Sequence, residues 1–250
     1  MIELQNITKR FPVYDDNSVP NEQVRKGFFY ALNDVSLTIH DGECTIIAGA
    51  NGSGKSLLMS IIARLEEPTY GRVKTDEKIG LVFQEPDAQI LGETPREDIA
   101  FGPRNMKLSK KEILSRVNDA LKETGLEERA DFPARSLSGG EKRRLAAAGV
   151  LAMDAKTIIF DEPYANLDYP GVVQVNKLFQ KLIASSKTVI ILTHELEKCL
   201  ALSSKFIVLC KGNKVFDGSA CDALNCDLAA WGIHNPLSKR PEKIEDLLWL

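Results

Sequence analysis

The sequence lacks long hydrophobic runs, has few cysteines and shows no excess of basic residues. No apolar run in its 250 residues approaches the ~20 needed to cross a bilayer, so we expect no transmembrane helix. The five cysteines form no C-x-x-C pair, which predicts reduced thiols in a cytosol. A net charge of −3 argues against a general nucleic-acid-binding surface. The first residues contain no basic segment followed by an apolar core, so we expect no secretory signal.

One glycine-rich segment stands out against this ordinary background. Residues 49–56 read Gly-Ala-Asn-Gly-Ser-Gly-Lys-Ser and match the phosphate-binding pattern G-x-x-x-x-G-K-[S/T]. An apolar strand pattern at 44–48 precedes the segment and a helical pattern at 57–65 follows it. Backbone N–H groups at such a turn point at phosphate oxygens, and the helix dipole adds to the attraction. We therefore predict that Lys55 reaches the terminal phosphates and that the Ser56 hydroxyl holds Mg²⁺.

Strand and helix patterns alternate along most of the chain. Strand patterns occur at 2–7, 35–39, 44–48, 79–83, 157–160 and 188–192, with a closing hairpin at 206–216, and helical patterns at 57–65, 171–184 and 195–202. The Asp41-Gly42 turn predicts that 35–39 and 44–48 pair as a hairpin. We predict an α/β fold: a phosphate-loop NTPase core with a mostly parallel sheet and an N-terminal antiparallel β lobe.

Strand patterns are missing between residues 86 and 150. Two capping boxes, Ser-Lys-Lys-Glu at 109–112 and Ser-Gly-Gly-Glu at 138–141, open helices that run to about residues 124 and 152. We therefore predict an α-helical lobe inserted into the core. The second box has two glycines, so Ser138 and bare backbone amides can also bind phosphate. The chain would then carry two anion-binding helix ends.

Two carboxylates come directly after an apolar strand pattern. Asp161 and Glu162 follow residues 157–160, where a phosphate-loop enzyme needs a carboxylate to hold Mg²⁺. Asp161 suits the metal, and Glu162 then lies where it can activate an attacking water as general base. Gln84 and His194 also follow predicted strands, at the sheet edge where ligands bind. Taken alone, each of these two is more often a solvated polar residue.

In this order the segments resemble the nucleotide-binding subunit of ATP-binding-cassette (ABC) transporters over about residues 1–218. The pattern consists of the phosphate loop, Gln84, Leu-Ser-Gly-Gly-Glu at 137–141, Ile-Ile-Phe-Asp-Glu at 158–162, Ala-Asn-Leu-Asp at 165–168, and His194. The Leu-Ser-Gly-Gly-Glu element is the most diagnostic, because other phosphate-loop enzymes lack it. The resemblance implies that two subunits sandwich two ATP molecules head to tail. The phosphate loop of one would face residues 138–140 of the other.

The resemblance implies a role for each candidate. The catalytic residues are Glu162, His194 and Gln84, and the Mg²⁺ ligands are Ser56, Gln84 and Asp161. The residues acting on the partner's ATP are Ser138, Gly139, Gly140 and Asp168. The nucleotide-binding residues are Phe11, Asn51, Gly52, Ser53, Gly54, Lys55, Ser56 and Leu57. Phe11 stacks on adenine, with Tyr14 as second candidate, because the loop at 14–29 is longer than usual. Where the family usually has a threonine after the phosphate loop, this chain has Leu57. The loop that ends in Leu-Asp usually begins with serine or a small residue, and here it begins with Ala165-Asn166.

Further segments narrow the resemblance to the ATPases of energy-coupling-factor (ECF) importers, which take up vitamins or cobalt and nickel ions. They are Phe-Gln-Glu-Pro-Asp-Ala-Gln at 83–89, Glu-Asp-Ile-Ala-Phe-Gly-Pro at 97–103, Gly-Gly-Glu-Lys-Arg-Arg at 139–144 and Val-Phe-Asp-Gly at 215–218. Such importers pair two ATPase subunits, identical or paralogous, with a membrane coupling protein and a substrate-capture protein. We therefore expect an ATPase with ATP and Mg²⁺ at the cytoplasmic face of the membrane, with an ATP-binding domain at 1–219 and a helical tail at 220–250.

Two other classes of cassette ATPase compete with this interpretation. A soluble enzyme such as an iron–sulfur-cluster assembly ATPase is the nearest alternative, and the segment at 84–103 argues against it. A DNA-repair or chromosome ATPase carries long coiled-coil insertions before its Leu-Ser-Gly-Gly element. Here that gap holds only about 80 residues without sustained heptads, and the net charge is acidic, so we expect no nucleic-acid partner.

Overall fold

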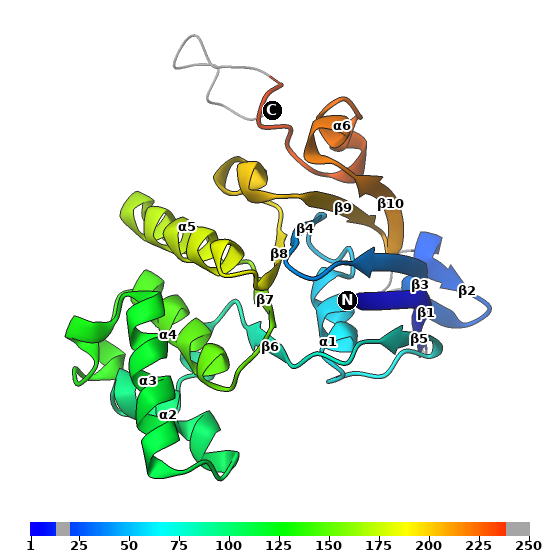
Figure 1. Cartoon of the computed structure of the whole chain (residues 1–250). Helices are drawn as coiled ribbons and strands as arrows, with labels where there is room; N and C mark the ends of the chain where they lie inside the picture. Colours follow the sequence, from blue (N-terminus) through cyan, green and yellow to red (C-terminus); the bar gives the residue numbers. More distant parts are fainter. Residues whose placement is uncertain (14–20, 239–250) are drawn as a thin grey trace.

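The computed structural model describes residues 1–13 and 21–238, which form two sheets and a helical lobe (Figure 1). The antiparallel sheet has the order β2-β3-β1-β5, and the six-stranded sheet has the order β10-β9-β4-β8-β7-β6. The second candidate for adenine stacking, Tyr14, and residues 239–250 of the expected helical tail lie outside the described residues. The α/β fold with its antiparallel lobe and its inserted helices is confirmed.

The antiparallel sheet is larger than the sequence patterns indicate. Its strands are β1 (Ile2–Pro12), β2 (Val24–Arg25), β3 (Phe28–Ile39) and β5 (Tyr70–Lys74). The segment expected from the sequence to be a loop, 14–29, contains β2 and the 3₁₀ turn Asn21–Gln23 before it. Strand β5 was missed because it is a largely exposed edge strand without a hydrophobic face.

The six-stranded sheet consists of β4 (Cys44–Ala48), β6 (Ile79–Val82), β7 (Thr157–Asp161), β8 (Thr188–Thr193), β9 (Lys205–Cys210) and β10 (Asn213–Gly218). All neighbours pair in parallel except β9 and β10. Every residue of β4, β7 and β8 is buried, as expected for a sheet covered on both faces. Neighbouring residues alternate between two cores: Ile46 packs in the core with α5 and the helical lobe, and Ile47 in the core with α1.

The predicted hairpin of 35–39 with 44–48 is wrong. Strand β3 pairs with β1 in the antiparallel sheet, whereas β4 lies between β8 and β9 in the other sheet. The chain does turn here, because the Glu43 N–H donates to the His40 carbonyl at 3.3 Å. A half-buried alternating strand and a fully buried strand need different surroundings, so the turn carries the chain from one sheet to the other.

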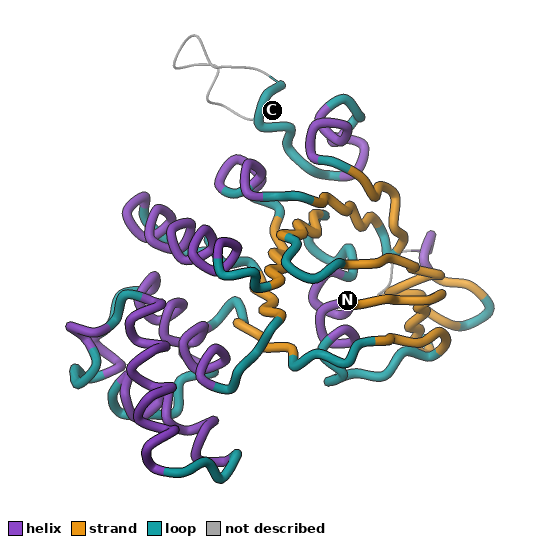
Figure 2. Tube along the Cα trace, viewed as in Figure 1, coloured by secondary structure: helices purple, strands orange, loops and turns teal. Residues whose placement is uncertain are grey.

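The helical lobe lies between β6 and β7 in the chain and apart from the antiparallel sheet in space (Figure 2). It contains α2 (Pro95–Asn105), α3 (Lys110–Thr124) and α4 (Gly139–Ala152), and both predicted capping boxes are formed. The other helices are α1 (Lys55–Ile62), α5 (Tyr169–Ala184) and the short α6 (Ala220–Leu224). The helix expected at 195–202 is instead two 3₁₀ turns, Leu196–Lys198 and Leu200–Leu202. Among the described residues, no helix has the length and apolar character to cross a membrane.

Candidate nucleotide-hydrolysis site

Four neighbouring strands of the parallel sheet end at one edge. In spatial order β4, β8, β7 and β6 are followed by the phosphate loop, by His194, by Glu162 and by Gln84. Asp161 is the last residue of β7, opposite Leu192 of β8. Because all four strands run in the same direction, these residues collect at the edge where open α/β sheets bind ligands.

The phosphate loop leaves the first turn of α1 open to a ligand. Gly54 has φ of 102°, and a Cβ there would lie 2.9 Å from the Ala31 carbonyl oxygen, so no other residue fits without strain. The residue before the helix provides no side-chain cap, so the first backbone N–H groups keep their donors for another acceptor. This is the arrangement that binds phosphate at a helix N-terminus.

Lys55 is buried inside the loop. Its Nζ donates to the carbonyls of Gly49 at 2.7 Å and Ala50 at 3.2 Å, and it lies 3.6 Å from Glu162 Oε1. Burial lowers the pKa of Lys55, and the carboxylates of Glu162 and Asp161 oppose that shift. A cation held by carbonyl groups can exchange them for phosphate oxygens, which are stronger acceptors.

Glu162 is held in a strained backbone conformation between two sides of the site. Its φ is 43°, which is rare for a residue with a side chain and is fixed by its N–H donating to Leu192 O at 2.9 Å. Its Oε1 lies 3.0 Å from Nδ1 of His194, whose side chain is half-exposed. One carboxylate oxygen therefore contacts both Lys55 and His194.

The remaining carboxylate oxygens fit a bound cation. Asp161 Oδ1 and Glu162 Oε2 are buried and have no hydrogen-bond partner among the described residues. Burial raises the pKa of Asp161, and a hydrogen bond with Ser56 opposes this shift. Buried carboxylate oxygens without donors are costly unless a cation or water reaches them. The Asp161 carboxylate and the Ser56 hydroxyl are oxygen ligands of the kind that Mg²⁺ prefers, and Glu162 Oε2 is open to a water.

Gln84 and Phe11 are predicted to act on the chain's own nucleotide, and both lie at the margin of the site. Gln84 follows β6 by two residues, and its side chain is exposed without a hydrogen bond to the described residues. Phe11 lies near the end of β1 with 43% of its surface exposed, and the Lys9 ammonium lies 5.5 Å from the centre of its ring. Phe11 is accessible to a stacking partner.

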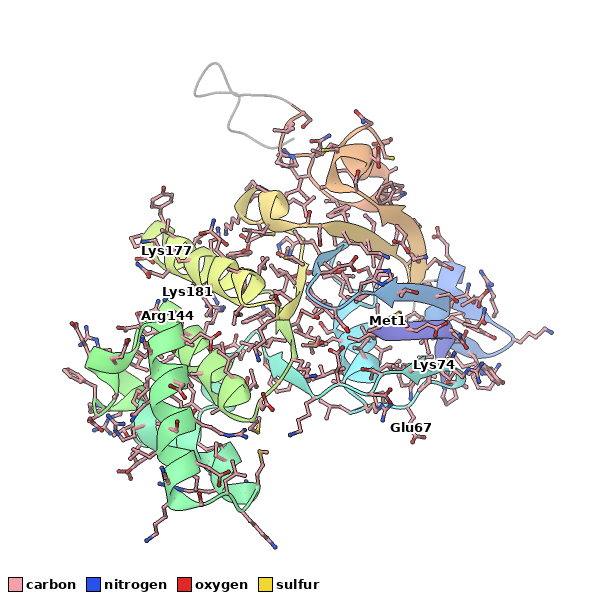
Figure 3. All side chains as sticks on the ribbon, viewed as in Figure 1. Met1, Glu67, Lys74, Arg144, Lys177 and Lys181 are labelled. Carbon is pink, nitrogen blue, oxygen red and sulfur yellow. The ribbon has the colours of Figure 1, made fainter. Side chains whose placement is uncertain are left out.

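The residues predicted to act on a partner's ATP form a separate groove of about 640 Å³, none of whose lining comes from the phosphate loop. Asp168 caps α5 by accepting the Gly171 N–H at 2.9 Å, which brings it beside the start of α4. The groove is lined by Ser138, Gly139, Gly140, Glu141, Arg144, Asn166, Leu167, Asp168, Pro170, Gly171 and Gln174. Figure 3 shows Arg144 where α4 approaches α5.

The roles predicted from the sequence do not include the other residues that line this groove. Asn166 has a φ of 59°, a conformation that asparagine tolerates better than most residues, and it bends the chain toward α4. Arg144 contributes from α4, where it stands in a basic run after the second capping box. The signal for Arg144 was therefore present, but only the packing of α4 beside α5 brings it to the groove.

The sequence is similar to known proteins over nearly its whole length. The model of the ABC transporter family matches residues 32–165. The energy-coupling factor transporter ATP-binding protein EcfA1 of Mycoplasma mobile is 37% identical over 90% of this chain and 82% of its own length. An EcfA2 protein of Symbiobacterium thermophilum is 40% identical over 82% of this chain and 78% of its own length.

Solved structures give the same result. CbiO1 from Clostridium perfringens, described as part of the ABC transporter complex CbiONQ, superposes with a TM-score of 0.77 at 31% identity, covering 94% of this chain and 95% of that one. The dimeric ATP-binding cassette MJ0796, bound to ADP and Pi, has a TM-score of 0.72 at 30% identity over 88% of this chain and 99% of that one. Sequence and fold agree, and the chain belongs to the ABC transporter family as one of its ATP-binding, ATP-hydrolysing proteins.

Proposed function

We propose that this chain hydrolyses ATP to energise an ECF-type importer, as one of two ATPase subunits bound to a membrane coupling protein and a substrate-capture protein. The observation that carries the proposal is the separation of two half-sites: the phosphate loop with Glu162 at the sheet edge, and the groove between α4 and α5. Two copies, or this chain and a paralogue, complete two sites head to tail. The relatives named EcfA and the CbiONQ component support the importer class.

We infer hydrolysis from the contacts in the cis half-site, which is the half-site at the sheet edge that binds the chain's own ATP. The groove between α4 and α5, which faces the partner's ATP, is the trans half-site. Lys55 and the amides of the first turn of α1 bind the β- and γ-phosphates, with Asn51, Gly52, Ser53 and Leu57 lining the loop and Phe11 on the adenine. Glu162 orients and activates the attacking water through its free Oε2. His194 holds the other oxygen of Glu162 and contacts the γ-phosphate.

Ser56, Asp161 and Gln84 would hold Mg²⁺, which neutralises charge on the phosphates when bound. The partner's Ser138, Gly139 and Gly140 contribute a helix N-terminus to the γ-phosphate, and its Asp168 loop approaches from beside them. The chain acts peripherally, on the cytoplasmic side, because the proposed coupling protein connects it to the membrane.

Capture of the tagged full chain from a gentle detergent extract tests the importer class. We expect an integral membrane protein together with a second cassette ATPase or a second copy of this chain. Recovery of soluble scaffold proteins alone would favour the iron–sulfur-cluster alternative.

A matched pair of surface variants sharpens this experiment. Leu91 is 66% exposed in the segment at 84–103, beside a groove of about 420 Å³ that Gly92 helps to line. Leu65 is 64% exposed after α1. We expect Leu91→Arg to release the membrane protein and Leu65→Arg to retain it. If both variants retain the membrane protein equally well, the partner does not bind through the 84–103 segment.

A further inference from the structure

Arg143 connects two loops that belong to different half-sites. It lies in the first turns of α4, and only 4% of its surface is exposed. Its Nη2 donates to the Ala165 carbonyl at 2.6 Å and to the Gln84 carbonyl at 3.3 Å. Gln84 follows β6 in the cis half-site, whereas Ala165 opens the loop that leads to Asp168 in the groove. A single guanidinium therefore bridges the Gln84 loop and the loop that leads to Asp168.

A third loop faces the same guanidinium. The carboxylates of Glu85 and Glu195 act on Arg143 and raise its pKa, while burial, the larger effect, lowers it. Glu195 follows His194 in the loop after β8, so charge from that loop also acts on a side chain that already contacts the loops after β6 and β7. Its Nε is buried without a hydrogen-bond partner among the described residues. An arginine stays protonated in proteins, so a full positive charge is buried at this junction.

Packing alone does not explain a buried charge here. A desolvated cation is costly, and a hydrophobic residue of similar volume often serves stability as well or better. The cation does, however, require both carbonyl oxygens to stay where they are, because losing one would leave a buried donor unsatisfied. An ion pair of 2.6 Å between Lys142 and Asp87 ties the same turn of α4 to the same loop.

We propose that Arg143 is a positioning residue that makes the Gln84 loop and the Asp168 loop move together, so that each subunit presents its cis and trans half-sites to ATP at the same time. This inference rests on the proposed dimeric ATPase. It assigns Arg143 no contact with ATP, since its donors point at main-chain oxygens of its own chain.

The first test compares three variants in the complex with the membrane partner. Arg143→Met keeps the volume and removes every donor, and Arg143→Lys keeps the charge but reaches one carbonyl at most. We expect kcat to fall about 10- to 100-fold for Met and less for Lys, with KM for ATP within about threefold of the unmodified chain. The control is Arg116→Met, because Arg116 also donates to a main-chain carbonyl, that of Ala152 at 3.2 Å, but at the far end of α4.

A second readout works without the membrane partner. In a Glu162→Gln background, ATP should bind without being hydrolysed rapidly and should drive two chains together. We expect Arg143→Lys to raise the protein concentration needed for half-association about tenfold. ATP binding to the monomer should be unchanged. A double-mutant cycle with Gln84→Ala should be non-additive, because Arg143 acts through the Gln84 loop. Additive effects, unchanged kcat and association, or a rise in KM alone would each overturn the inference.

The two proposals fail in different ways. If the unmodified chain hydrolyses ATP but recruits no membrane protein, the importer class is wrong, and the association assay still decides the role of Arg143. If Arg143→Met does not fold, Arg143→Lys carries the kinetic and association tests on its own. Loss of stability in both Arg143→Lys and Arg116→Met, with normal kcat in both, would assign Arg143 a purely structural role.

Discussion

The two helix N-termini assigned to phosphate differ in how their own backbone is satisfied. Helix α1 starts after Gly54, which offers no side-chain acceptor, whereas α4 starts after Ser138 in a complete capping box. The α1 end lies against a buried lysine, Lys55, and the α4 end faces an open groove. The first end is therefore incomplete without a ligand, and the second is stable without one. This difference supports the proposal that one subunit binds ATP by itself and needs a second subunit for hydrolysis.

The largest effect is expected when two inactive variants of the chain are mixed, because activity should then return. Lys55→Ala removes the phosphate-binding cation, and Ser138→Arg fills the groove end, so each variant alone should lose hydrolysis. In a mixture, the intact phosphate loop of one chain meets the intact α4 end of the other, and activity should partly return. The measurement is phosphate release before and after mixing, with each variant mixed with itself as control. A mixture as inactive as its components would contradict head-to-tail sites.

The cis half-site is tested by its general base. Glu162→Gln keeps the shape but replaces the carboxylate, whose Oε2 has no hydrogen-bond partner among the described residues, by an amide that cannot accept a proton. Turnover should fall roughly 10²- to 10⁴-fold, since that is the usual contribution of a positioned general base. Nucleotide affinity, measured by equilibrium binding, should stay near that of the unmodified chain. Full turnover, or loss of binding instead, would remove Glu162 from this role.

Dilution separates the half-sites without any mutation. If the α4 groove acts on the partner's ATP as proposed, specific activity should fall once the chain is diluted below its dimerisation constant, while ATP binding by the α1 end persists. Activity per chain and sedimentation can be followed over the same concentrations. Constant specific activity in a chain proven monomeric would place a complete site in one subunit.

The smallest expected effect, and the most specific test, comes from the two capping boxes. Ser109 caps α3 and Ser138 caps α4 with the same hydrogen-bond pattern. Replacing either by alanine should cost about 1 kcal/mol of unfolding free energy in denaturant titrations. Only Ser138→Ala should also lower kcat, because α3 takes no part in the groove. A similar loss of activity in Ser109→Ala would mean that helix stability, rather than phosphate contact, limits turnover.

Local patterns predicted the elements in which neighbouring residues determine structure. The capping boxes relate residues three apart, and α3 and α4 begin after the serines of their boxes and end at residues 124 and 152, as predicted. The phosphate loop is equally local. Patterns failed where partners are distant in the chain: β5 has no hydrophobic face of its own, and β3 and β4 look like a hairpin although they enter different sheets.

Short patterns of residue types are enough to identify the phosphate loop, the Leu-Ser-Gly-Gly-Glu helix end and the two strand-end carboxylates. Which of them share a site depends on how strands and helices that are distant in the chain pack together. Strand order brings Lys55, Glu162 and His194 within contact distance, and the packing of α4 on α5 puts Ser138 beside Asp168. The same packing buries Arg143 against two carbonyls far from it in the chain. Contacts of this kind depend on long-range packing, which no short pattern contains.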